Sequence, residues 1–507
     1  MPTATFRSIN PQTATAFGPE FVESSKEEVE KKILAAHAIR REFADLEPKR
    51  RAALLREIAD AIESRREKLV AIAPLETGLP VARITSEVTR TVVQIRAFAT
   101  MVETGIHYNA TIDLPDPDFQ PAPRPDIRKF NQSLGVVAIF AASNFPLAFS
   151  VMGGDSASAL AAGCPVIVKA HPSHPQTSEI VFQAVQSALR SLGLPGEIFS
   201  IAHGQNPELT HWLATADHVT AIGFTGSGLV GKLLVKLASE RKVPIPVFAE
   251  MGSLNPVFIT TNAITERASA IAKGAAESVL MGSGQFCTKP GLFFIPSDST
   301  GDVFIAEFTI QLSQSQAAPL LNPGIRDRYK KSMAELESAP VISVLHGLPG
   351  SDTGLSVQPA VIVVNAEEFA RMPQLSEEHF GPTSVIVRAS VASYSAIAAS
   401  IEGQLTTTIH AGADEQDDLS KLISELAQIS GRVIWNGFPT GVAVTAAMNH
   451  GGPWPASSTN TTSVGIDATY RFLRPVSYQG FPDAYLPPAL QASNPWKIER
   501  VTNGVRG

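Results

Sequence analysis

The chain has 507 residues, 44% hydrophobic and 18% charged, and its 41 Lys and Arg against 48 Asp and Glu give a formal net charge of −7. This composition predicts a folded protein with a large core and excludes wholesale disorder, and the mildly acidic balance gives no reason to expect a nucleic-acid partner. The two cysteines, Cys164 and Cys287, form no CxxC pair, which excludes a disulfide framework and a Cys-based zinc site.

The beginning of the chain and its apolar runs bear on location. Residues 1–17 are polar and contain no apolar segment typical of a secretory signal. The longest apolar stretch, residues 136–142, is far shorter than a membrane span. We therefore expect a cytoplasmic protein with no membrane partner.

The first quarter of the chain has helical periodicity. Apolar residues recur at helical spacing over residues 26–46, 48–75 and 81–101, with charges between them. Residues 114–128 are instead rich in Pro and Asp, which predicts an exposed arm or an edge hairpin.

From residue 134 onward, short β-branched runs alternate with amphipathic stretches. The predicted strands of the first series are 134–140, 165–169, 198–202 and 219–225, and its helices are 148–162, 176–192, 208–215 and 227–240. A second series has strands 245–249, 257–260, 291–296, 361–364 and 383–389 and helices 265–281, 303–314, 394–401 and 415–427. Such alternation predicts an α/β fold with parallel sheets, and the segment after residue 436 is predicted to be mostly loop.

Cys287 is the first candidate for chemistry. It lies in a loop, Met281-Gly-Ser-Gly-Gln-Phe-Cys-Thr-Lys-Pro-Gly291, whose glycines let the backbone approach a ligand closely. A thiolate is a strong nucleophile. The alternative is a buried structural cysteine, but the glycine-rich, polar neighbourhood favours the nucleophile. Cys164, between a predicted helix and strand, is interpreted as a core residue.

A second candidate is the GxGxxG run at residues 226–231, which follows a strand and opens a helix as a dinucleotide fingerprint requires. Glu250 lies 19 residues beyond Gly231, so this pattern alone would assign it to a ribose hydroxyl. The alternative is an accidental match in a chain with 36 glycines. Under either interpretation the helix N-terminus can bind a phosphate.

Three further positions have a functional and a structural interpretation. Asn144 follows a strand and could donate to an oxyanion, or could form an Asx turn before Pro146. Lys169 ends a strand and could bind a ribose or phosphate, or be a solvated lysine. Acids precede a Gly-Pro turn at residues 377–382, as a binding site or as a charged loop. Because no carboxylate cluster accompanies His171 and His174, no metal site is predicted.

Together these motifs resemble the NAD(P)-dependent aldehyde dehydrogenase superfamily over about residues 20–480. The matching segments are Asn144-Phe-Pro, Val168-Lys169, Phe224-Thr-Gly-Ser227, Phe248-Ala-Glu250-Met-Gly252, Gly284-Gln-Phe-Cys287 and Glu378-His-Phe380-Gly-Pro. Residues 142–149, 171–175 and 449–455 are most similar to the branch that oxidises 2,5-dioxopentanoate (α-ketoglutarate semialdehyde). The resemblance implies a Rossmann-type cofactor domain (1–113 and 131–249), an α/β catalytic domain (250–440), and a small β oligomerisation element (114–130 and 441–507).

The resemblance also implies residue roles, and it replaces the ribose assignment of Glu250. Cys287 would attack the aldehyde, Asn144 and the Cys287 N–H would hold the oxyanion, and Glu250 would activate the hydrolytic water. The turn of Thr225, Gly226 and Ser227 would bind pyrophosphate. The other implied cofactor contacts are the nicotinamide ribose at Glu378, the nicotinamide end at Phe380 and the adenosine ribose at Lys169.

The sequence also gives expectations for the cofactor and for the substrate. Many NAD-preferring relatives have Glu three residues after the lysine, whereas this chain has Pro172, which favours NADP with NAD as a further possibility. The expected substrate is 2,5-dioxopentanoate. The alternatives are a medium-chain or fatty aldehyde, a CoA-acylating reaction, which the presence of Glu250 disfavours, and a non-catalytic scaffold. The expected assembly is a homodimer or homotetramer.

Overall fold

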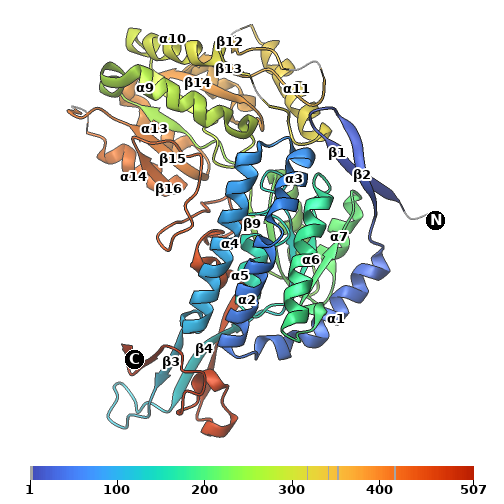
Figure 1. Cartoon of the computed structure of the whole chain (residues 1–507). Coiled ribbons are helices and arrows are strands. Elements are labelled where there is room, and N and C mark those ends of the chain that lie inside the picture. The colour runs from blue at the N-terminus through green and yellow to red at the C-terminus, as the bar shows by residue number, and fades with distance from the viewer. Residues whose placement is uncertain (1–3, 317, 341, 351–352, 416–417, 507) are drawn as a thin grey trace.

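The computed structural model describes residues 4–316, 318–340, 342–350, 353–415 and 418–506. Figure 1 shows one lobe built mainly from the first half of the chain, a second lobe built from residues after about 250, and an arm near the C-terminus. Each lobe has its own sheet, and a third sheet forms the arm. The α/β architecture expected from the sequence is confirmed.

The N-terminal region contains a hairpin that the polar sequence did not reveal. Strands β1 (Thr5–Asn10) and β2 (Thr15–Val22) pair antiparallel. Helices α1 (Lys26–Ala44), α2 (Pro48–Glu63), α3 (Arg66–Thr77) and α4 (Val81–Thr104) follow. The single helix expected over residues 48–75 is therefore two helices, and the chain turns between them at Ser64 and Arg65.

The first lobe contains a five-stranded parallel sheet in the order β7-β6-β5-β8-β9. Its strands are β5 (Val136–Phe140), β6 (Val166–Lys169), β7 (Phe199–Ala202), β8 (Val219–Thr225) and β9 (Val247–Glu250). Its helices are α5 (Gly154–Ala161), α6 (Pro175–Ser191), α7 (Pro207–Thr215) and α8 (Gly228–Ser239). Because all strands run the same way, Lys169, Thr225 and Glu250 end at one edge of this sheet.

The second lobe contains a seven-stranded sheet in the order β12-β13-β14-β11-β10-β15-β16, in which β12 alone is antiparallel to its neighbour. Its strands are β10 (Val257–Ile259), β11 (Leu292–Pro296), β12 (Ser343–His346), β13 (Ala360–Asn365), β14 (Thr383–Ala389), β15 (Gln404–His410) and β16 (Ser430–Trp435). Its helices are α9 (Thr261–Leu280), α10 (Ser299–Ser313), α11 (Pro323–Glu337), α12 (Ala366–Arg371), α13 (Tyr394–Ser400) and α14 (Ser420–Ile429).

Helix α11 and strands β15 and β16 were missed from the sequence. Strand β15 is fully buried although it carries three consecutive threonines. Thr406 donates to Asn255 Oδ1 and Thr407 bonds to the Ser430 hydroxyl, so these hydroxyls are satisfied inside the lobe. Residues 416 and 417 of the helix expected over 415–427 lie outside the described residues, and α14 begins at Ser420.

The arm is a five-stranded sheet in the order β17-β4-β3-β18-β19. Its strands are β3 (Ala110–Asp113), β4 (Ile127–Ser133), β17 (Leu473–Gln479), β18 (Arg500–Thr502) and β19 (Val505–Arg506). The Pro-rich segment between β3 and β4 is mostly exposed, as expected. The segment after residue 436 is mostly loop, also as expected, and contains the short strands β17, β18 and β19. None of the described helices is both long and apolar enough to cross a membrane.

Candidate active site

The backbone around Cys287 is held rigidly between α9 and β11. Gly282, Ser283 and Gly284 have φ of 57°, 56° and 70°, the left-handed region that favours glycine. A Cβ on Gly284 would collide with the carbonyl oxygen of Gly381, so this glycine is required by packing as well. On the other side, Asn255 Nδ2 donates to the Cys287 carbonyl at 2.8 Å. The loop therefore presents the thiol in one defined position.

Two buried polar side chains, His450 and Glu250, meet at this thiol. Cys287 Sγ lies 3.5 Å from His450 Nε2, and the same nitrogen lies 3.0 Å from Glu250 Oε1. Ser463 Oγ donates to Glu250 Oε2 at 2.7 Å. His450 is 1% exposed and Glu250 4%, so this cluster is shielded from solvent. The result is a chain of groups along which a proton can move from the sulfur.

The charges of the cluster are set by burial and by each other. Burial raises the pKa of Glu250, but His450 and Ser463 more than offset it and leave that pKa below its ordinary value. Burial, reinforced by the negative charge of Glu250, raises the pKa of the Cys287 thiol well above its ordinary value. The resting pair is thus a protonated thiol beside a carboxylate, and the thiol needs a nearby proton acceptor to become a nucleophile.

Asn144 lies beyond the carboxyl end of β5 and reaches the cysteine loop. Its Nδ2 donates to the Gln285 carbonyl at 3.0 Å. Because an amide nitrogen carries two hydrogens, the bond leaves a second donor. The bond to the loop also orients the amide, so the simple Asx turn is not the whole description of this residue.

The edge of the first sheet has features that fit a dinucleotide. Thr225 pairs with Glu250 in the ladder, and Gly226 N donates to the Glu250 carbonyl at 3.1 Å. Ser227 is the N-cap of α8 but its side chain makes no capping bond, and the Cβ position of Gly228 faces open space. The first amides of α8 are therefore accessible to a phosphate.

Lys169 and Glu378 are both partly buried ionisable groups. Burial lowers the pKa of Lys169 to about 8, while the Glu23 carboxylate acts in the opposite direction. Burial raises the pKa of Glu378 to about 7, with Lys289 acting against it. Glu378 lies over Gly252, where a Cβ would collide with its carboxylate, and this places it two residues beyond Glu250 along the backbone.

The segment that carries Glu378 is fixed by Lys289. The Lys289 ammonium donates to the carbonyls of His379 at 2.6 Å, Gly381 at 3.1 Å and Thr383 at 2.8 Å. Phe380 is partly buried against the large hydrophobic core that both lobes share. Residues 377–382 therefore form a loop that is anchored to the residues flanking Cys287, and their role as a binding site stays a prediction.

The structure brings Cys287 and Glu250 together and adds two residues that the sequence reasoning did not assign, His450 and Ser463. His450 lies in the segment 449–455, and the similarity of that segment to the 2,5-dioxopentanoate-oxidising branch is the one sequence feature that points to it. One atom each of Glu250, Cys287 and His450 lie within 4.8 Å of one another, and the expected absence of a metal there stays a prediction. Cys164, in contrast, is fully buried and donates to the Phe472 carbonyl at 3.5 Å.

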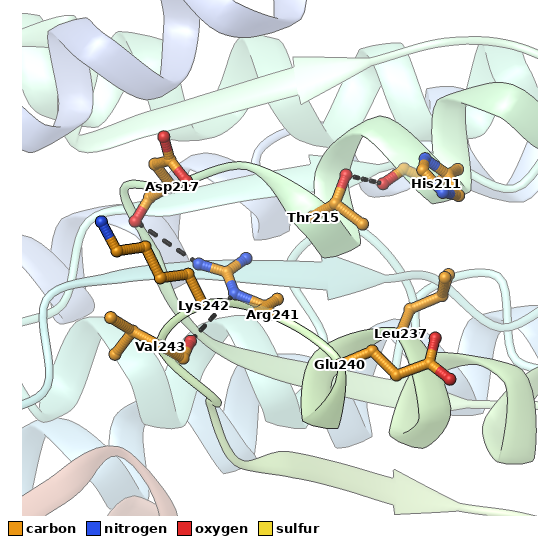
Figure 2. Close-up of a pocket in the computed structure, with 8 residues that line it drawn as sticks. All are labelled: His211, Thr215, Asp217, Leu237, Glu240, Arg241, Lys242 and Val243. Atoms are coloured by element: carbon orange, nitrogen blue, oxygen red, sulfur yellow. Dashed lines mark hydrogen bonds between the residues drawn. The ribbon is translucent and has the colours of Figure 1, made fainter.

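A separate hollow of about 500 Å³ lies at the opposite edge of the first sheet (Figure 2). It is lined by His211, Thr215, Asp217, Leu237, Glu240, Arg241, Lys242 and Val243. One part of its lining precedes β8, and the other part comes from the end of α8 and the loop that follows it. Arg241 donates to the carbonyls of Ala214 and Val219, each at 2.9 Å. This cation ties the loops together, and the hollow shares no lining residue with the cluster at Cys287.

Comparison with known proteins places the whole chain. An α-ketoglutaric semialdehyde dehydrogenase 2 of Azospirillum brasilense is 44% identical over 456 residues, which cover 90% of this chain and 87% of the relative. An α-ketoglutaric semialdehyde dehydrogenase of Acinetobacter baylyi is 37% identical over 506 residues, which cover 99% and 95%.

Solved structures give the same fold at lower identity. A glyceraldehyde-3-phosphate dehydrogenase of Methanocaldococcus jannaschii complexed with NADP superposes with a TM-score of 0.79 at 20% identity, covering 94% of this chain and 99% of that one. The model of the aldehyde dehydrogenase family matches residues 2–474. Since this match spans nearly the whole chain and includes the Cys287 cluster, the protein belongs to the aldehyde dehydrogenase family.

Proposed function

We propose that this chain oxidises 2,5-dioxopentanoate to 2-oxoglutarate with a nicotinamide cofactor, by way of a thioester on Cys287. The observation that carries the proposal is the buried cluster in which His450 Nε2 lies 3.5 Å from the sulfur and 3.0 Å from the Glu250 carboxylate. The substrate rests on the names of the two relatives at 44% and 37% identity.

The first step uses His450 as the proton acceptor. Its Nε2 takes the thiol proton, and the imidazolium so formed is paired with ionised Glu250. The thiolate adds to the aldehyde carbon. The resulting oxyanion accepts hydrogen bonds from the free hydrogen of the Asn144 amide and from the Cys287 backbone N–H. Both donors are positioned before the reaction, because Asn144 is tied to the cysteine loop.

A nicotinamide cofactor, when bound, supplies the hydride acceptor. Its pyrophosphate would be held at the uncapped N-terminus of α8, by Thr225, Gly226 and Ser227. Glu378 and Phe380 would hold the nicotinamide end, and Lys169 the adenosine end. Glu250 then takes a proton from the water that attacks the thioester, the C–S bond breaks to release the carboxylic acid, and the Cys287 thiolate takes back the proton held by His450. Ser463 fixes Oε2 of Glu250, and Oε1 lies 3.0 Å from His450 Nε2 on the side of the thiol.

Preference for NADP is part of the proposal. Pro172 places no carboxylate next to Lys169, whose partly buried ammonium would favour a 2′-phosphate. The Ser173 hydroxyl accepts from Asn322 Nδ2 at 3.0 Å and can still donate to a phosphate oxygen. The same proposal includes the division into a cofactor domain, a catalytic domain and an arm. It also includes assembly into a homodimer or homotetramer through the arm sheet.

A substrate panel tests the function. Purified protein is assayed at 340 nm with 2,5-dioxopentanoate, succinic semialdehyde and hexanal, each with NADP and with NAD. We expect the highest kcat/KM for 2,5-dioxopentanoate with NADP. A higher kcat/KM for hexanal would replace the proposed substrate by the medium-chain aldehydes, and turnover that requires CoA would replace hydrolysis by acyl transfer.

A further inference from the structure

Arg90 is a half-buried cation whose buried guanidinium nitrogens have no hydrogen-bond partner among the described residues. It projects from α4, and its pKa is lowered because burial disfavours its charge. Among the described residues, no acceptor lies within hydrogen-bonding reach of its buried Nε and Nη2. An unsatisfied buried guanidinium is costly, and it is the planar, bidentate group that best matches a carboxylate.

The neighbouring acid on the same helix is already saturated. Glu87 Oε1 accepts from the backbone amides of Leu147 and Ala148, at 3.0 and 2.9 Å. Its Oε2 accepts from Arg83 at 2.8 Å. Glu87 therefore neutralises Arg83 and holds the segment after Asn144, and it makes no hydrogen bond to Arg90. The helix thus supplies one arginine that is hydrogen-bonded to Glu87 and one, Arg90, on which Glu87 acts only through its charge.

Aromatic rings connect Arg90 to the reaction centre. Its guanidinium lies over the rings of Phe149 and Phe145, 5.0 and 5.6 Å from their centroids. The Phe149 ring in turn contacts the His450 ring, with centroids 6.0 Å apart. Phe145 packs edge-on against Phe286, the residue next to Cys287, at 5.1 Å. These rings leave an apolar surface between the cation and the thiol.

We propose that Arg90 binds the carboxylate of the aldehyde substrate and thereby selects aldehydes that carry a terminal carboxylate. The cation satisfies the charged end, and the rings of Phe145 and Phe149 contact the methylene segment that leads to the aldehyde at Cys287. This specificity role rests on the proposed function, because it assigns a site to the carboxylate of 2,5-dioxopentanoate. No catalytic role is assigned to Arg90.

A second effect of Arg90 has to be separated from this one. Its positive charge lowers the pKa of the Cys287 thiol, against the larger effects of burial and Glu250 that raise it. Loss of Arg90 therefore reduces the thiolate fraction for every substrate alike. Only the ratio of two kcat/KM values, for a carboxylated and for an uncharged aldehyde, reports the carboxylate contact.

The test compares Arg90→Met, Arg90→Lys and the wild type on 2,5-dioxopentanoate and on hexanal. We expect Arg90→Met to lower the ratio of kcat/KM for 2,5-dioxopentanoate over hexanal by roughly 10- to 150-fold, which corresponds to the hydrogen bonds of a charged group. Arg90→Lys keeps the charge without the bidentate geometry and should restore part of the ratio. The Ki of glutarate, a dicarboxylate that cannot be oxidised, should rise in Arg90→Met by a similar factor.

The matched control is Arg96→Met, on the same helix, which removes an exposed arginine paired with Asp60 and should leave the ratio unchanged. An unchanged ratio in Arg90→Met, with both substrates slowed equally, would overturn the proposal and leave Arg90 as a group that only tunes the thiol. If wild type prefers hexanal, the proposed substrate fails by itself, and the glutarate Ki still decides whether Arg90 binds a carboxylate.

Discussion

The two cysteines of this chain both have raised pKa values, yet their surroundings differ completely: Cys164 is fully buried, whereas Cys287 is only partly buried. Burial raises the pKa of Cys164 to about 11, and its sulfur lies beside a backbone carbonyl in the main core. For Cys287 the negative charge of Glu250 adds to burial, and a histidine nitrogen lies 3.5 Å from the sulfur. A raised pKa therefore does not distinguish a core thiol from a nucleophile.

What distinguishes the two sites is a path for the proton and for the charge that the reaction creates. At Cys287 the proton acceptor, the carboxylate that stabilises the resulting imidazolium and an amide donor for the oxyanion converge from three separate segments. At Cys164 the thiol donates to the Phe472 carbonyl, and its other hydrogen-bonding neighbours are the backbone of Leu134 and Gly135 and the Ser133 hydroxyl, none of which is a base that can take up its proton. A reactive cysteine is thus better identified by its neighbours than by its pKa.

Removing each sulfur in turn tests the comparison most severely. Cys287→Ser should abolish dehydrogenase turnover, because a serine hydroxyl is far less acidic than a thiol, while leaving cofactor affinity nearly unchanged. Cys164→Ser should stay close to wild type in turnover. Steady-state rates at 340 nm and cofactor binding by fluorescence quenching check both. More than a few per cent of activity in Cys287→Ser would remove this residue from the mechanism.

Removing the carboxylate separates the two halves of the reaction. Glu250→Gln should lower steady turnover by roughly 10²–10⁴-fold, the usual contribution of a general base, because hydrolysis of the thioester loses its proton acceptor. The burst of reduced cofactor should survive. Since the negative charge of Glu250 raises the thiol pKa, its loss lowers that pKa, and the burst rate should reach its plateau at lower pH than in wild type.

Weakened cofactor affinity together with loss of the burst in Glu250→Gln would instead support the ribose-binding interpretation of this acid. Glu240→Gln is the matched control, because Glu240 is an exposed acid at the other end of α8. It should change neither the burst nor the steady rate.

His450→Gln tests the proton path itself. The burst rate should fall by about 100-fold at neutral pH, the lower end of general-base effects, because Glu250 remains beside the thiol. The raised thiol pKa means that the thiolate fraction grows as pH rises, so the variant should recover rate at alkaline pH. Stopped-flow measurement of the burst from pH 6 to 10 follows this recovery. A loss that is the same at every pH would mean that His450 only supports the packing around Phe149.

The sequence predicted those parts of the molecule that follow from local patterns. Alternating apolar runs and amphipathic stretches revealed β5, β6 and β8 and the helices between them. The motifs around Asn144, Glu250 and Cys287 could each be recognised from a few consecutive residues. Strand β15 was missed because its three consecutive threonines are polar and are satisfied by partners far along the chain, such as Asn255 for Thr406.

The remainder of the site depends on contacts that no local pattern contains. His450 is 163 residues from Cys287, and Ser463 is 213 residues from Glu250. Arg90 reads in sequence as one more charge on an amphipathic helix. The structure shows what the sequence does not: the Arg90 guanidinium lies over the rings of Phe145 and Phe149, and Glu87 is hydrogen-bonded to Arg83 instead.

The smallest expected effect contrasts the adenosine end of the cofactor site with the reaction centre. Pro172→Glu places a carboxylate three residues after Lys169, and a like charge near a 2′-phosphate at ~4 Å costs between about 1 and 4 kcal/mol. At the lower limit, kcat/KM for NADP relative to NAD should fall by about fivefold. Pro172→Gln, which removes the proline without adding charge, is the control and should leave the ratio near that of wild type.

The Glu23 carboxylate already acts on Lys169, so Glu23→Gln should shift the ratio in the opposite direction, toward NADP. A wild-type preference for NAD of tenfold or more, or equal ratios in Pro172→Glu and Pro172→Gln, would show that charge at this end does not decide the cofactor. The cluster at Cys287 would be unaffected by either outcome, because none of its three groups contacts residues 169–173.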